Sequence, residues 1–199
     1  RTYIKGCFFQ IIRLNAGTGF RVVNLFTEEH AALTGARDVV IEEALEPEES
    51  YNITLNYMKK LYLKNGMYFT FDTSTWYTYF TNAIIPDYDT NPNQIIYGNL
   101  DGYSTSTGLS FNIDAVLGSG INASIGATYQ DVSQTENGEH TEQILTEKFS
   151  GVWSFSYKNY PTNLTIDYTG NIYGPMRLPL LGDLDPRQEY SPTWSIQNI

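Results

Sequence analysis

Two histidines lie beside acidic residues and are the first candidates for chemistry in this sequence. His30 follows Glu28 and Glu29, and His140 lies between Glu139 and Glu142. Imidazole and carboxylate groups can bind zinc, but neither cluster has the two histidines at helical spacing that a zinc protease uses. A histidine of this kind in a loop is usually solvated. We therefore expect no metal site.

Other sequence motifs that suggest chemistry have simpler explanations. Tripeptides that begin at Asn52, Asn122 and Asn163 match the acceptor for N-glycosylation, but each lies in a segment that we interpret as a strand with a polar face. The single cysteine, Cys7, can form no disulfide within the chain. No nucleophile is paired with a base, and no glycine loop could hold a phosphate. The sequence predicts no enzyme, no catalytic residue and no cofactor.

Composition excludes several classes of protein. The net charge of -10 argues against a nucleic-acid partner, because binding to phosphates requires a concentrated excess of Lys and Arg. Mean hydropathy is -0.32, and no run of about 18 apolar residues could form a membrane-spanning helix. Aromatic residues make up 15% of the chain and charged residues only 17%, below the charged fraction of a typical soluble domain.

Alternation of apolar and polar residues is the strongest pattern in the chain. From Tyr51 to Leu63, apolar side chains occupy every second position, with Lys59 as the exception, and the other face carries Asn52, Thr54, Asn56 and Lys60. The same period of two returns in residues 109–117, 121–130, 149–157 and 164–169. This period is typical of β-strands with one apolar and one polar face.

Strand length and connection length favour a membrane barrel over a soluble sandwich. Several alternating runs extend over roughly 10 to 15 residues, long enough to cross a bilayer at a tilt. Short turns at 64–66, 118–120 and 158–161 alternate with longer connections at 84–93, 133–141 and 173–190. Outer-membrane barrels have short periplasmic turns and long extracellular loops. We predict an all-β fold, an antiparallel transmembrane β-barrel.

One segment has the features of a short helix. Thr27 could cap a helix over residues 28–33, and Gly35 could end it. This helix would lie in the connection between a strand that ends near Phe20 and one that begins near Glu48.

Several segments resemble signatures of TonB-dependent receptors. A strand that ends in Gly19-Phe20-Arg21 precedes a loop with Asn24-Leu25-Phe26, and Leu45-Glu46-Pro47-Glu48-Glu49-Ser50 opens the next strand. Residues 99–103 and 168–176 also look like barrel segments of that family. The resemblance covers Ile11 to Ile199, and residues 1–10 fit the family less well.

The resemblance implies a fragment of a large plugged barrel. Receptors of this family have about 22 antiparallel strands around an N-terminal plug, and this chain would supply about eight of them from the later part of the barrel. Residues 1–199 would then form a partial barrel domain, without the plug and the final strands. The implied location is the outer membrane of a Gram-negative bacterium. The implied partners are outer-membrane lipid and, through the plug, the TonB-ExbB-ExbD system.

The resemblance also implies a function and candidate sites. Such a receptor imports a scarce nutrient, an iron-siderophore or related metal complex or cobalamin, which the extracellular loops bind first. The expected loops are Val22 to Pro47, Ile84 to Asn93, Ser133 to Thr141 and Tyr173 to Tyr190. Candidate ligand contacts within them are Phe26, His30, Tyr88, His140, Met176, Arg177 and Arg187. Candidate residues that face the lumen and plug are Asn52, Asn56, Asp72, Asn112, Asp114, Gln130, Asp167 and Asn171.

Three other interpretations remain open from the sequence. The chain could be a complete small barrel of about eight strands, a passive porin, or a soluble β-sandwich that binds a ligand. A porin would lack the signatures around Arg21 and Glu48 and would pass small solutes without energy. A soluble sandwich would be stable in water without detergent.

Overall fold

The computed structural model describes residues 7–22, 38–41, 45–87, 90–91, 93–136, 138–179 and 186–199. The helix expected after Thr27 lies outside these residues, as do Phe26, His30 and Tyr88. In the described part of the chain, no helix is long and apolar enough to cross a membrane.

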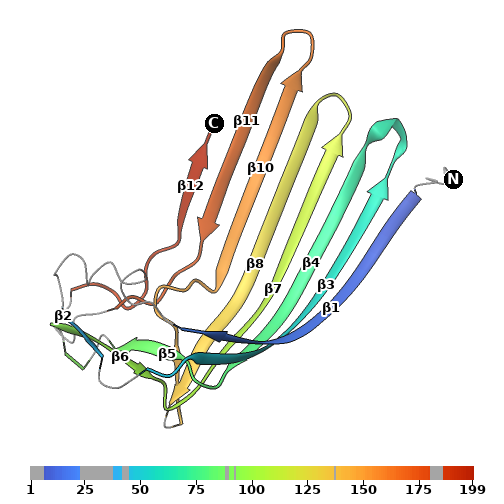
Figure 1. Cartoon of the computed structure of the whole chain (residues 1–199). Helices are drawn as coiled ribbons and strands as arrows, with labels where there is room; N and C mark the ends of the chain where they lie inside the picture. Colours follow the sequence, from blue (N-terminus) through green and yellow to red (C-terminus); the bar gives the residue numbers. More distant parts are fainter. Residues whose placement is uncertain are drawn as a thin grey trace.

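The described strands form one large curved antiparallel sheet and one small sheet (Figure 1). The order in the large sheet is β1-β3-β4-β7-β8-β10-β11-β12, which makes β1 and β12 the unpaired ends of this path and leaves the sheet open in the described residues. A further strand, β9, pairs with β8. The bounds are β1 Cys7–Arg21, β3 Glu48–Tyr62, β4 Tyr68–Phe80, β7 Gly102–Leu117, β8 Ile121–Glu136, β9 Glu139–Glu142, β10 Phe149–Asn159, β11 Leu164–Tyr173 and β12 Trp194–Asn198. The prediction of an all-β antiparallel fold is confirmed.

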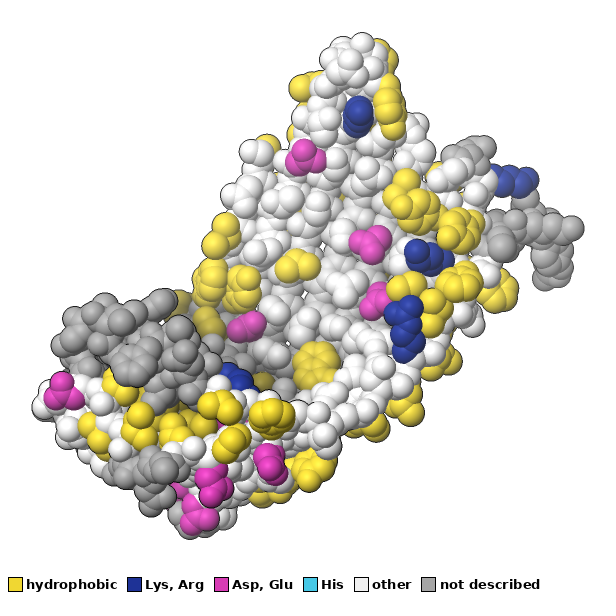
Figure 2. All heavy atoms as spheres, viewed as in Figure 1, with side chains coloured by type: hydrophobic (Ala, Val, Ile, Leu, Met, Phe, Trp, Pro, Cys, Tyr) yellow, Lys and Arg dark blue, Asp and Glu magenta, His cyan; other side chains and the backbone are white. Residues whose placement is uncertain are grey.

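The register of the large sheet separates an apolar face from a polar face. One row across β3, β4 and β7 joins Tyr57, Thr73 and Phe111, and the adjacent row joins Met58, Asp72 and Asn112 on the opposite face. Because side chains alternate across a strand, each row keeps its face over the whole sheet. Figure 2 shows the polar face, where hydrophobic side chains are few over the centre of the sheet.

The apolar face is open to its surroundings. Ile53, Leu109 and Ile125 are 47%, 54% and 52% exposed, although they lie in the middle of long strands. An apolar surface that extends over most of a sheet is far larger than a soluble monomer usually exposes. This face therefore requires an apolar environment, which a bilayer provides.

Tight turns lie at one rim of the large sheet, which we call the short-turn rim. The 3-10 turn η1 (Lys64–Gly66) joins β3 to β4, and a turn at residues 118–120 joins β7 to β8. Ser119 and Gly120 both have positive φ, which lets the chain reverse direction within these three residues. The turn expected at 158–161 instead occupies residues 160–163, because β10 continues to Asn159.

Long connections lie at the opposite rim, which we call the long-connection rim, and they contain more structure than the sequence indicated. The segment expected to be a loop at 84–93 begins with strand β5 (Ile84–Asp87). The loop expected at 133–141 is largely a hairpin of β8 and β9, which turns at Gly138 with φ +83°. The Asn-Gly dipeptide at 137–138 is a strong hairpin signal that explains this correction.

The small sheet combines two of these connections. Strand β6 (Gln94–Asn99) pairs in parallel with β2 (Asp38–Ile41), and on its other side it pairs antiparallel with β5. Ile84, Ile95 and Tyr97 form a small buried core against which Val39 and Leu45 pack. The connection before β3 and the connection after β4 therefore fold together as one unit.

Candidate functional site

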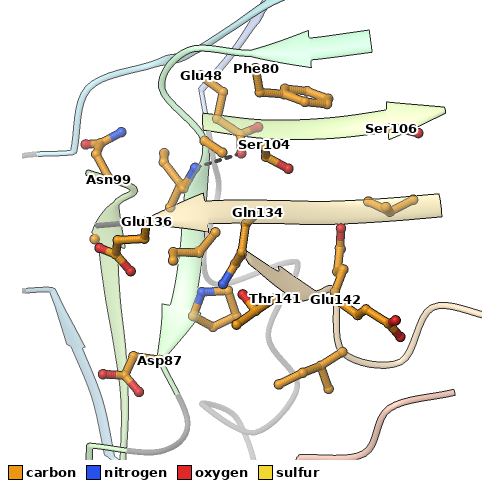
Figure 3. Close-up of a pocket in the computed structure, with 18 of the residues that line it drawn as sticks. Glu48, Phe80, Asp87, Asn99, Ser104, Ser106, Gln134, Glu136, Thr141 and Glu142 are labelled. Atoms are coloured by element: carbon orange, nitrogen blue, oxygen red, sulfur yellow. Dashed lines mark hydrogen bonds between the residues drawn. The ribbon is translucent and has the colours of Figure 1, made fainter. Parts of the chain in front are cut away.

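A cavity of about 1090 Å³ opens between the polar face of the large sheet and the small sheet, at the long-connection rim. Its wall on one side comes from the ends of β1, β3, β4, β7 and β8, and on the other from β5 and β6 (Figure 3). In Figure 3, Ser104 and Gln134 belong to the large sheet, whereas Asp87 and Asn99 belong to the small one. A volume of this size accommodates a small-molecule ligand.

Glu48 fastens the small sheet to the large one. The residue is 8% exposed, and its Oε2 accepts a hydrogen bond from Nε of Arg21 at 2.5 Å. Its Oε1 accepts a second hydrogen bond from the backbone N–H of Ile84, at 2.9 Å (Figure 3). Arg21 and Glu48 are also register partners at the ends of β1 and β3. One buried carboxylate thus joins β1, β3 and the start of β5.

Neighbouring residues strengthen the same junction through backbone groups. Asn99 accepts from the N–H of Glu46 at 2.9 Å and donates to the carbonyl of Glu46 at 3.1 Å. Asn82 donates to the carbonyl of Pro47 at 2.9 Å. The segment before β3 is therefore held by side chains from both ends of the β4 to β7 connection.

Acidic side chains outnumber basic ones in the lining of the cavity. Glu136 and Glu139 are directly opposite each other in the β8–β9 hairpin, an arrangement that like charges normally disfavour. The acidic lining residues are Glu48, Asp87, Glu136, Glu139 and Glu142, and the basic ones are Arg21 and Arg177. The potential inside the cavity therefore favours neutral or positively charged ligands over strongly anionic ones.

A second group of charges joins β9 to the connection before β12. Lys148 donates to Oε1 of Glu142, and the hydroxyl of Tyr190 donates to Oε2 of Glu142 at 3.3 Å. The hydrogen bond from Lys148 holds the pKa of Glu142 below its ordinary value, and the same contact raises the pKa of Lys148. Loss of hydration, followed by the charge of Glu142, raises the pKa of Tyr190.

Arg177 links this group to the cavity. Its Nη1 donates to the carbonyl of Glu142 at 3.4 Å, and its Nε lies 3.5 Å from Oε1 of Glu189. Its backbone carbonyl accepts from the N–H of Leu145 at 2.8 Å. Arg177 therefore supports two connections at the same time as it lines the cavity.

Of the ligand contacts expected in the described loops, only Arg177 lines this cavity. His140 lies on β9, and its Nδ1 is 3.3 Å from the hydroxyl of Thr135. Met176 is bound through its backbone to Ser191. Arg187 donates to the carbonyl of Pro179 at 2.8 Å. No group of His, Cys, Asp and Glu in the described residues is arranged to hold a metal ion.

The cavity also has lining residues that were not expected as site residues. Alternation in a hairpin would have put Glu139 and Thr141 on the side of the cavity and His140 on the other side, whereas Glu142 lines the cavity from the end of β9. Glu136 and Gln134 could be found only once β8 was known to extend past Ser133. The Asn-Gly dipeptide at 137–138 is the feature of the sequence that indicates this longer β8.

The polar positions expected to face a lumen share one face of the sheet. The register places Asn56 beside Ser74, Asp114 beside Ser124 and Asp167 beside Ser156. Asn56 donates to Ser74, and Ser124 donates to Asp114 at 2.7 Å. By the same register, Asn52, Asp72, Asn112, Gln130 and Asn171 lie on this face as well.

The arrangement is matched by known proteins. A sequence model of the family described as TonB dependent receptor-like, beta-barrel, matches residues 9–194. The chain belongs to this family. The resemblance found in the sequence is confirmed, and the signatures around Arg21 and Glu48 are the two segments that the Arg21–Glu48 ion pair joins.

Solved structures agree on the fold. The FrpB iron transporter from Neisseria meningitidis, F3-3 variant, matches with a TM-score of 0.62 and 13% identity over 94% of this chain and 29% of FrpB. The apoprotein form of the F5-1 variant matches with a TM-score of 0.55 and 13% identity over 80% of this chain and 25% of FrpB. The chain thus spans less than a third of the length of either structure. A search of curated protein sequences found no match.

Membership of this family shows on which side of the membrane each rim lies and which face of the sheet contacts lipid. The TonB-dependent receptor barrels are proteins of the Gram-negative outer membrane, with short turns in the periplasm and long loops outside the cell. The apolar face is the lipid face, and the cavity lies toward the extracellular side.

Proposed function

We propose that this chain is part of a receptor that imports a scarce nutrient across the outer membrane with energy supplied through TonB and its partners ExbB and ExbD. The cavity carries this proposal, because it lies on the polar face at the extracellular rim, where a ligand would first meet the barrel. The connection that contains β5 is joined to the large sheet by the hydrogen bond from the backbone N–H of Ile84 to Glu48. A bound ligand would therefore contact loops and barrel wall together.

The proposed ligand is an iron-siderophore or related metal complex, or cobalamin. The similar FrpB structures are described as iron transporters, which supports iron within this set. The excess of carboxylates in the cavity lining supports a neutral or cationic complex over a strongly anionic chelate. Arg177 and the connections around it are the proposed contacts.

The polar face is proposed to surround a plug of the family type. Its Asn, Ser and Thr side chains already bond one another, as in the contact from Asn52 to Thr78 at 2.8 Å. Hydrogen bonds to water and to a plug can exchange with these at small cost, whereas packed apolar contacts would have to be broken. A polar wall thus lets a plug shift under force from TonB.

The experiment is uptake of radiolabelled complexes by cells that express the full-length gene, with and without TonB. A neutral iron-siderophore, an anionic iron-siderophore and cobalamin are supplied separately. We expect uptake of one neutral complex that requires TonB. Uptake that is the same without TonB would identify a passive barrel and refute the proposal.

A matched pair of variants tests the cavity itself. Arg177→Gln removes a charge in the lining, whereas Arg187→Gln removes a charge that lies outside it. We expect ligand affinity in whole cells to change only for Arg177→Gln. Equal effects of both substitutions would show that the cavity is not the ligand site.

A further inference from the structure

Lys59 is a cation on the lipid face of the barrel. It lies in the row with Gln10 of β1 and Phe71 of β4, between the rows that contain Tyr57 and Leu61. Tyr62 ends β3 at the short-turn rim, so Lys59 is about 10 Å along the strand from the periplasmic edge. A charge at this depth needs either water or an anion as its partner.

Asp72 lines a groove beside Lys59, but the register places its side chain on the opposite, polar face of the sheet. Among the residues that the structure describes, no carboxylate forms an ion pair with Lys59. Its ammonium group lies 5.8 Å from the ring centroid of Phe8. Phe8 is the register partner of Leu61, so the side chain of Lys59 is directed toward the periplasmic edge, where lipid headgroups lie.

An apolar groove of about 410 Å³ begins beside Lys59. Its floor is Thr73 of β4, and its walls include Tyr57, Phe71 and Phe111. The surface is recessed at Thr73 because this small residue lies in a row between the larger Tyr57 and Phe111.

Beyond the groove, β4 carries a second small outward-facing residue toward the centre of the membrane. Thr75 is the next outward residue after Thr73, and its row neighbours are Leu55 and Leu109. The hydroxyls of Thr73 and Thr75 donate to the carbonyls of Ser110 and Gly108, at 2.9 and 3.0 Å. With the hydroxyls satisfied by backbone, the threonines turn their methyl groups outward, and the floor is apolar in spite of its sequence.

We propose that Lys59 and this groove bind one phospholipid of the periplasmic leaflet that carries a net negative headgroup. The phosphate would pair with the ammonium group of Lys59, and one acyl chain would lie over Thr73 and Thr75. The headgroup supplies an anion that no described carboxylate provides to Lys59, and the acyl chain fills a depression that would otherwise be left as a void under the lipid. The site depends on the outer-membrane location of the barrel and is independent of transport.

The experiment is native mass spectrometry of the full-length receptor in detergent, with phosphatidylglycerol or phosphatidylcholine of identical acyl chains added. We expect the receptor to retain phosphatidylglycerol in preference. Lys59→Gln should lower that retention about fivefold, the effect of one basic residue at a membrane surface. Lys60→Gln is the matched control, because Lys60 has the same depth but lies on the polar face.

A second pair of variants tests the groove. Thr73→Trp fills the floor and should abolish preferential retention while Lys59 is intact, whereas Thr73→Val keeps the volume and should bind as the native protein does. Assembly of every variant is checked by its heat-modifiable migration in gels. Equal retention of the two lipids by the native receptor, or equal effects of Lys59→Gln and Lys60→Gln, would overturn the proposal. Retention by Thr73→Trp that equals that of Thr73→Val would also overturn it.

Discussion

Removal of the Glu48 carboxylate should release the small sheet from the barrel wall. In Glu48→Ala, the N–H of Ile84 loses its acceptor at a position where Ile84 is only 9% exposed. A buried donor without a partner costs about 1 to 3 kcal/mol. The side chain of Arg21 is 56% exposed, so water screens the lost ion pair and adds less than about 1 kcal/mol.

This cost predicts a measurable local opening. A loss of about 1 to 3 kcal/mol raises the equilibrium constant for opening by about 5- to 150-fold. Hydrogen exchange of the full-length receptor, followed by mass spectrometry of peptides from residues 81–100, measures that opening. Exchange should accelerate in the connection between β4 and β7 and stay unchanged in β10 and β11.

Two further variants make this prediction specific. Glu48→Gln keeps an oxygen for the N–H of Ile84 and loses only the charge, so its effect should be the smaller one. Glu49→Ala is the control, because Glu49 is exposed and its contact with Thr81 is made by its backbone carbonyl, which the substitution keeps. Exchange in Glu48→Ala no faster than in Glu49→Ala would refute the role assigned to the carboxylate.

Three other outcomes can be checked on the same full-length receptor. Gly108→Ala should impair assembly, since its Cβ would lie 2.1 Å from the ring of Trp76, whereas Gly98→Ala meets nothing within 4 Å and should assemble normally in a heat-modifiability assay. The Glu142–Lys148 contact lowers the folded pKa of Glu142, so its stabilising effect is present above the unfolded value of 4.5 and is lost as the pH falls through the lower folded value. Proteolysis within residues 174–193 should therefore increase in acid, and that increase should be absent in Glu142→Gln. Asp114→Asn combined with Asp167→Asn should alter uptake and leave the barrel assembled; normal uptake would contradict a role for these charges in the lumen.

Much of the large sheet could be predicted from the sequence. The alternation from Tyr51 to Leu61 fixes which side chains share a face, since a shift of one residue would move the whole apolar set to the polar side. Exposed Ile53 and Leu55 confirm that the apolar face is not a soluble core. The strand ends were less predictable, because β7 and β8 extend into polar residues where the alternation fades.

The candidate site could be predicted only in part. Arg177 was expected in a loop and does line the cavity, but its contacts with Glu142 and Glu189 come from folding of two separate connections. The Asn-Gly dipeptide at 137–138 indicates the hairpin of β8 and β9. Recognition of that dipeptide would have predicted that Glu136 and Glu139 lie opposite each other at the cavity. Phe26 and His30 remain predictions outside the described residues.

The sequence by itself determined the period, the two faces, the short turns and the family. These features are local or repeat along the chain, so they leave a signature in neighbouring residues. Only the tertiary structure decided that β2 pairs with β6 and that Glu48 bonds both Arg21 and Ile84. Such contacts join segments that are distant in the sequence through one or two groups, so they leave no repeating pattern in the sequence. They are stable because the groups are buried, and that burial exists only after the connections have folded together.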